Sequence, residues 1–80
     1  MTMLNILKEK LASESIQSKV IQEYTGIYYV KASDLTTQEV FFILTEMEIE
    51  IMNEKENVKL PIEDLDLVVK KLKDFLQKLQ

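Results

Sequence analysis

The sequence contains no cysteine, no histidine and no tryptophan, and it has only one glycine and one proline. Without cysteine, the chain can form no disulfide, no thiolate metal site and no cysteine nucleophile. Without histidine, it also lacks the usual general base at neutral pH and the commonest metal ligand. The carboxylates, lysines, tyrosines and hydroxyls that remain have no obvious activating partner. We therefore predict that the protein is not an enzyme, with no catalytic residue, metal site or cofactor.

Positive charge and long apolar segments are also scarce. The chain carries 10 basic and 14 acidic side chains, for a net charge of −4, which disfavours binding to a nucleic-acid phosphate backbone. The longest fully apolar run, Val40 to Leu44, is far shorter than the ~20 residues that span a bilayer. The first ten residues lack the basic start and apolar stretch of a signal peptide. We expect a cytoplasmic protein that binds neither nucleic acid nor membrane.

What the sequence does contain is typical of a small globular domain. Hydrophobic residues make up 46% and charged residues 30% of the 80 positions, which is ordinary for a folded chain and unlike a disordered tail. A chain of this length is too short for two hydrophobic cores, and no repeat or Pro/Gly-rich linker divides it. We predict a single domain over residues 1–80.

Helices are predicted at the two ends of the chain. Thr2 is a plausible N-cap for a helix that carries leucines at helical spacing. Beyond Ala12 the apolar stripe changes direction, which predicts a break between Ser13 and Ser15. Near the other end, residues 62–79 show a continuous helical stripe, with acids at its start and lysines toward its end as the helix dipole favours. The apolar residues of the two stripes are Leu4, Leu7 and Leu11, and Ile62, Leu65, Val68, Val69, Leu72, Leu76 and Leu79.

The middle of the chain has two interpretations. Residues 27–30 are β-branched and aromatic, which favours an extended loop or a short strand. Residues 36–39 fit a helix capping box, and Gly26 would suit the position after a helix end. Residues 40–52 fit a helical period through Val40, Ile43, Leu44, Met47 and Ile51, but they also fit a strand period in which glutamates alternate with apolar residues. Periodicity alone does not separate helix from strand here.

A resemblance to a known family favours the helical interpretation. The segment that carries it reads Phe42-Ile43-Leu44-Thr45-Glu46-Met47-Glu48-Ile49. It resembles the motif of acyl carrier proteins, an Asp-Ser-Leu triplet followed by two variable residues, a hydrophobic residue, Glu and an aliphatic residue. Residues 34–36 resemble the family's loop before this motif, and residues 58–65 and 69–76 resemble its segments after the second helix and in the last helix. The likeness therefore extends over about residues 34–76.

The resemblance implies an all-α fold, a small acyl-carrier-like helical bundle without its prosthetic group. Ile43 stands where the family has the serine that carries phosphopantetheine, and isoleucine has no nucleophilic atom, so no cofactor is expected. The implied function is protein binding through an acidic second helix, to a partner protein with a basic docking surface. The residues expected to contact that partner are Leu44, Met47 and Ile51, as an exposed apolar strip, and Glu48 and Glu54 beside it.

Two other functions are compatible with the residues. In the first, residues 27–33, 39–52 and 57–61 form a β-meander between two helices. This would be a small acidic α+β binding module acting as an inhibitor or immunity protein, for example on a mobile element, that binds a basic surface of its target. In the second, the chain is a structural subunit or homodimer with Phe41 and Phe42 buried at the interface. Simpler explanations also exist, because apolar stripes are usually core and charge runs are usually solvated surface.

Overall fold

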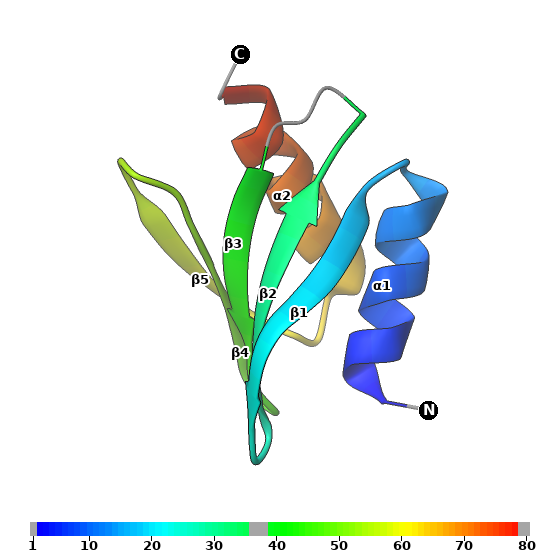
Figure 1. Cartoon of the computed structure of the whole chain (residues 1–80), viewed down its shortest axis with the longest axis vertical. Helices are drawn as coiled ribbons and strands as arrows, with labels where there is room; N and C mark the ends of the chain where they lie inside the picture. Colours follow the sequence, from blue (N-terminus) through cyan, green and yellow to red (C-terminus); the bar gives the residue numbers. More distant parts are fainter. Residues whose placement is uncertain (1, 36–38, 79–80) are drawn as a thin grey trace.

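The computed structural model describes residues 2–35 and 39–78, and shows two helices and five strands (Figure 1). The helices lie at the two ends of the described chain and the strands follow one another between them. The elements in chain order are α1 (Met3–Ser13), β1 (Gln17–Tyr24), β2 (Ile27–Ser33), β3 (Glu39–Leu44), β4 (Glu48–Met52), β5 (Asn57–Pro61) and α2 (Leu65–Lys78).

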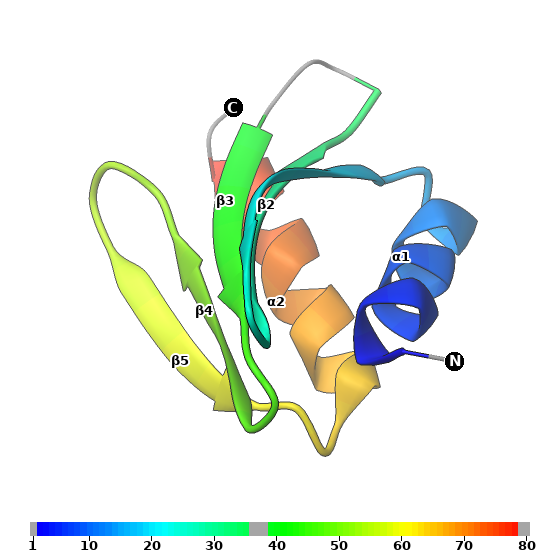
Figure 2. The ribbon, with the colours of Figure 1, turned by 60° about the horizontal axis from the view of Figure 1, so that its bottom comes forward.

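The five strands form one antiparallel sheet in which the spatial order follows the chain order, β1-β2-β3-β4-β5. Each strand therefore pairs with the strand before it and the strand after it, as in a simple meander. Both helices lie on the same side of this sheet (Figure 2). The sheet consequently has one face covered by helices and one face that no described element covers, which we call the open face.

The all-α prediction is wrong, and with it the resemblance to acyl carrier proteins. Residues 40–52 form β3, a turn and β4, so the expected second helix does not exist and Ile43 lies inside a strand. The α+β alternative gives the correct fold class, including a meander between two terminal helices. The meander is larger than that alternative supposed, because residues 17–24 form a further strand, β1.

Two polar turns explain why residues 40–57 do not continue as a helix. The Thr45 hydroxyl accepts hydrogen bonds from the backbone N–H groups of Met47 and Glu48, at 3.3 and 3.2 Å. The Asn53 side-chain carbonyl accepts from the N–H groups of Lys55 and Glu56, at 2.8 and 2.9 Å. Side chains of these types compete with helical hydrogen bonding by binding nearby backbone. Each turn reverses the chain and allows the next antiparallel strand to pair.

The first helix begins and ends as predicted, but the chain then continues differently. The Thr2 hydroxyl accepts from the N–H of Asn5 at 3.2 Å, and the helix ends at Ser13. Ser15 has a positive φ of 62°, which turns the chain into β1. Gly26, with φ 75°, lies in the turn between β1 and β2 and does not follow a helix. Residues 36–38 of the proposed capping box lie outside the described residues.

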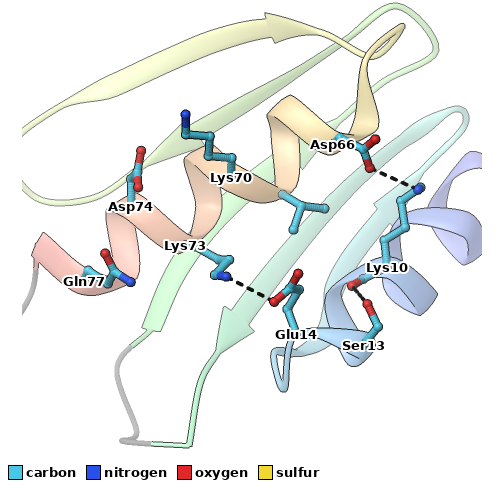
Figure 3. Close-up of a pocket in the computed structure, with 9 residues that line it drawn as sticks. Lys10, Ser13, Glu14, Asp66, Lys70, Lys73, Asp74 and Gln77 are labelled. Atoms are coloured by element: carbon cyan, nitrogen blue, oxygen red, sulfur yellow. Dashed lines mark hydrogen bonds and ion pairs between the residues drawn. The ribbon is translucent and has the colours of Figure 1, made fainter.

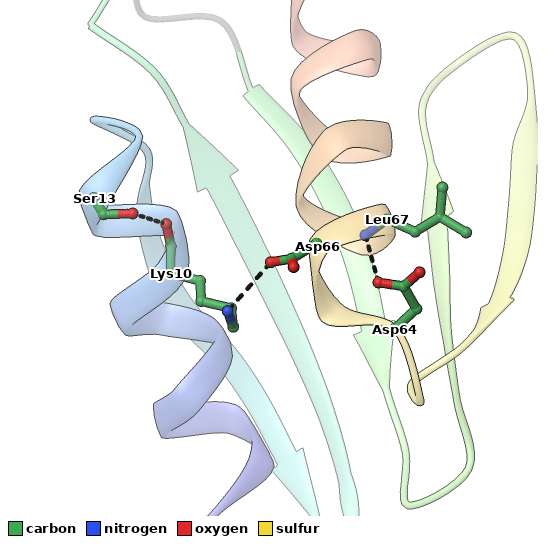
Figure 4. Close-up of polar contacts among 5 residues, drawn as sticks. All are labelled: Lys10, Ser13, Asp64, Asp66 and Leu67. Atoms are coloured by element: carbon green, nitrogen blue, oxygen red, sulfur yellow. Dashed lines mark hydrogen bonds and ion pairs between the residues drawn. The ribbon is translucent and has the colours of Figure 1, made fainter.

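The last helix starts three residues later than predicted, at Leu65 in place of Ile62. Its N-cap is Asp64, whose carboxylate accepts from the N–H of Leu67 at 3.1 Å (Figure 4). This capping role agrees with the expectation that acids at this position favour the helix dipole. Neither α1 nor α2, the two helices of the described chain, is long and apolar enough to cross a lipid bilayer.

The hydrophobic core lies between the covered face of the sheet and the two helices. In β2 to β5 every second side chain points toward it, because successive residues of a strand face opposite sides of a sheet. In β1 a bulge between Val20 and Gln22 interrupts this alternation. Leu72 of α2 is completely buried, as expected. None of the described polar or charged residues is buried. The core residues are Leu4, Leu7, Leu11, Ile16, Val30, Ala32, Val40, Phe42, Leu44, Ile49, Ile51, Val68, Val69, Leu72, Phe75 and Leu76.

Candidate protein-binding surface

The structure does not bring the five predicted partner-contacting residues together. Leu44 and Ile51 point into the core and are 2% and 0% exposed, so the predicted apolar strip is absent. Met47 is 80% exposed in the turn between β3 and β4. Glu48 begins β4, and Glu54 lies in the turn between β4 and β5, and both are exposed. Only these three residues are accessible to a partner, and they do not lie on a helix.

A polar groove lies between the two helices. It has a volume of about 470 Å³, and two ion pairs bridge it (Figure 3). The Lys10 ammonium lies 3.2 Å from the Asp66 carboxylate, and the Lys73 ammonium lies 3.1 Å from that of Glu14. Both pairs connect α1, or its C-cap Glu14, to α2. Their side chains are largely solvated, and such surface pairs stabilise a fold by only about 0–1 kcal/mol each, so the shared hydrophobic core is what holds the helices together.

The open face of the sheet presents an unusual number of apolar side chains. On β3, Phe41 and Ile43 occupy the outward positions, because Val40, Phe42 and Leu44 point into the core. The neighbouring strands place further apolar side chains beside them: Tyr29 is the cross-strand partner of Ile43, and Met52 is that of Phe41. We call the following set the apolar patch: Tyr24, Ile27, Tyr29, Phe41, Ile43 and Met52.

The aromatic members of the apolar patch are accessible. Phe41 is 45% exposed, against 1% for its neighbour Phe42. The rings of Tyr24 and Tyr29 meet edge to face, with centroids 5.8 Å apart, which places both on the same face of the sheet. Tyrosine rings held in this way present apolar area together with a hydroxyl, a combination that is frequent at protein interfaces.

Charged side chains surround the apolar patch in balanced numbers. Lys31 forms an ion pair with Glu39 at 3.1 Å. Glu50 is the cross-strand partner of Lys59 and accepts a hydrogen bond from the Asn57 side chain at 2.9 Å. Three lysines and three glutamates lie on the open face, so its net charge is zero although that of the chain is −4. These six residues are Lys19, Lys31, Lys59, Glu39, Glu48 and Glu50.

A hollow continues the apolar patch at the end of the sheet where two turns meet. It has a volume of about 710 Å³, and Ile27 belongs both to its lining and to the apolar patch. The exposed Met47 lies at its rim, and Leu60 and Pro61 of β5 complete its apolar wall. Two of the three accessible residues of the predicted site, Met47 and Glu48, therefore line this hollow, and Glu54 does not.

This surface is suited to binding through direct contact and through burial of apolar side chains. The described part of the chain holds no group of three acidic, histidine or cysteine side chains placed to bind a metal ion. All of its charged groups are at least partly exposed. Burial of apolar surface contributes a favourable free energy of about 25 cal/mol per Å². The apolar patch offers surface of this kind.

Sequence reasoning missed most of this surface, although a signal was present. Val40 to Leu44 is apolar at every position. In an antiparallel strand with one covered face, alternate positions are expected to be polar, so a continuous run indicates an apolar outer face. The homodimer alternative placed both Phe41 and Phe42 at an interface. The structure separates them, with Phe42 in the core and Phe41 on the open face.

Comparisons of the chain with protein-family models, with curated proteins and with solved structures give no match.

Proposed function

We propose that the protein is a binding module for another protein chain and that its docking surface is the open face of the sheet. The observation that carries this proposal is the exposed apolar patch centred on Phe41. A solvated sheet face normally alternates with polar residues, and contiguous apolar patches on small proteins mark interaction sites. Aromatic residues and methionine, which form much of this patch, are enriched at protein interfaces.

A nucleic-acid ligand suits this surface less well. Sheet faces that bind single strands combine stacking aromatic rings with a positively charged groove for the phosphates. Here the three lysines of the open face are matched by three glutamates, and the chain as a whole is acidic. Phosphates would therefore gain little electrostatic attraction. A protein surface with an apolar centre fits better.

The inhibitor or immunity role predicted from the acidic composition stays a prediction. It required a basic target, and the neutral open face gives no preference for one. Glu54 and the exposed acids of the turns lie at the ends of the sheet, outside the apolar patch. We therefore propose protein binding without assigning that role.

Affinity capture with paired variants tests the proposal. Phe41→Ser removes the centre of the apolar patch, and Leu67→Ser is its matched control because Leu67 is also partly exposed but lies on α2. We expect chains that co-purify with the tagged wild-type protein to be lost with Phe41→Ser and kept with Leu67→Ser. Equal urea midpoints must show that both variants fold. Equal capture by both variants would contradict a docking role for the open face.

A further inference from the structure

We propose that the hollow at the end of the sheet binds an extended, positively charged segment of the partner protein. One apolar side chain of that segment would lie in the hollow, with a lysine or arginine beside it at the rim. This inference rests on the proposed function, because the hollow continues the apolar patch. It adds the chemistry of the partner, which the neutral centre of the open face does not specify.

The shape of the hollow suits a chain segment. Of the residues that line it, Thr45 and Leu60 are half-buried and all the others are exposed, so the hollow is an open groove. Its volume of about 710 Å³ lies within the range of ligand sites, about 300–1,000 Å³. A small ligand is usually buried over most of its surface. A groove with exposed walls instead suits an extended segment that lies along it.

The apolar wall of the hollow comes from three separate parts of the chain. Ile27 begins β2, Met47 lies in the β3–β4 turn and Pro61 ends β5. The Met47 backbone is held in place, because its N–H donates to the Thr45 hydroxyl at 3.3 Å and its carbonyl accepts from the Ile62 N–H at 3.4 Å. Its side chain is 80% exposed, and methionine adapts readily to apolar partners. An apolar side chain in the hollow would remove this surface from water.

Two glutamates line the hollow without a cation to pair with. The Glu46 carboxylate lies beside the β1–β2 turn, since a Cβ added at Gly26 would be 3.8 Å from its Oε1. Glu48 begins β4 and lies on the open face. Neither forms an ion pair with a described residue, and the ion pairs found among the described residues all lie elsewhere. A lysine or arginine of a partner would find both carboxylates available.

The negative charge of the chain is concentrated around this end of the sheet and along β4 and β5. Residues 46–64 contain seven acids and two lysines, a net charge of −5, so the rest of the chain sums to +1. The lysine in the hollow, Lys59, stands opposite Glu50 on β4. The turn after β5 adds Glu63 and Asp64. A basic segment is therefore attracted here, and such complementarity selects partners and speeds their association.

Selection of a random-peptide phage library on the immobilised wild-type chain tests the partner chemistry. We expect the enriched peptides to carry lysine or arginine next to an apolar residue. The most enriched peptide is then labelled, and its affinity is measured by fluorescence anisotropy over a range of salt concentrations. Enrichment of acidic or uncharged peptides would overturn the inference, and so would a library from which no peptide binds above background.

Paired glutamate variants test the acidic rim. Glu46→Gln with Glu48→Gln should weaken binding of the labelled peptide about tenfold and reduce its salt dependence, because two charges that face the peptide are lost. Glu9→Gln with Glu54→Gln is the matched control, since it changes the net charge equally at exposed positions outside the hollow. It should bind the peptide as the wild type does. Equal loss with both double variants would contradict a specific rim contact.

Met47→Ser tests the apolar wall in the same way. It should also weaken peptide binding about tenfold, whereas Met3→Ser, at an exposed position on α1, should not. Equal urea midpoints must show that all the variants fold. A wild-type chain whose sedimentation coefficient rises with concentration, and a Met47→Ser chain whose coefficient does not, would assign the hollow to a second copy and overturn the inference.

The proposed function can fail or hold separately from this inference. If captured chains are lost with Phe41→Ser but kept with Glu46→Gln and Glu48→Gln, docking by the open face holds and the basic segment is wrong. If capture is unchanged by Phe41→Ser, docking by the apolar patch is wrong, whatever the peptide selection shows.

Discussion

Phe41 and Phe42 are neighbours in the sequence, but they have different environments because a strand directs successive side chains to opposite faces of the sheet. Phe42 packs in the core between the sheet and the helices, whereas Phe41 points to solvent from the centre of the open face. Sequence alone gives the two positions the same apolar character. Substitution of each residue separates its contribution to folding from its contribution to binding.

Phe42→Ala should lower the free energy of unfolding by about 3–5 kcal/mol, because it removes a large buried ring and leaves a cavity. Phe41→Ala should change it by less than about 1 kcal/mol, since the ring is exposed in the free chain. Urea unfolding measures both values. Equal losses would show that the open face is covered within one copy of the chain.

At the scale of the elements, the terminal helices could be predicted and the sheet could not be predicted with certainty. The leucines of α1 and the long apolar stripe of α2 repeat at helical spacing over several turns, and their caps are local. The first strand could not be identified from the sequence because Ile16 and Val20 are four residues apart. A spacing of four fits one face of a helix and also one face of a strand.

The strands β3 and β4 were hidden for a different reason. The outward residues of β3 are apolar, so the alternation that identifies a half-buried strand is missing from Val40 to Leu44. Glutamates on β4 add a helix propensity that tertiary pairing overrides. The turn residues Thr45 and Asn53 carried the local signal. The same apolar outer face that obscured the strand also forms the candidate binding surface.

Asn53→Ala tests how much one turn contributes to the sheet. The substitution removes the side-chain carbonyl that accepts from Lys55 and Glu56, and we expect a loss of about 1–2 kcal/mol of unfolding free energy. Amide hydrogen exchange should speed up first in β4 and β5. Glu54→Ala, in the same turn, is the matched control and should have little effect. An equal effect of both changes would show that the Asn53 hydrogen bonds are not what holds the turn.

At the scale of the whole molecule, one hydrophobic cluster joins both helices to the sheet. A domain with a single core of this size is expected to unfold in one cooperative step. Far-UV circular dichroism and tyrosine fluorescence should therefore give coincident urea transitions, with a slope of about 1–3 kcal/mol per M. Two separate transitions would show that the helices and the sheet unfold independently.

The consecutive strand order has a consequence for how quickly the chain folds. Every strand pairs with its neighbour in sequence, so each hairpin can close over a short loop, and local pairings of this kind favour fast folding. The most distant contacts are those between α1 and α2, whose ion-paired residues are 56 and 59 positions apart. Closing a loop of that length costs more chain entropy than closing a hairpin. The sheet can therefore assemble one hairpin at a time. The two helices cover its face completely only when the two ends of the chain come together.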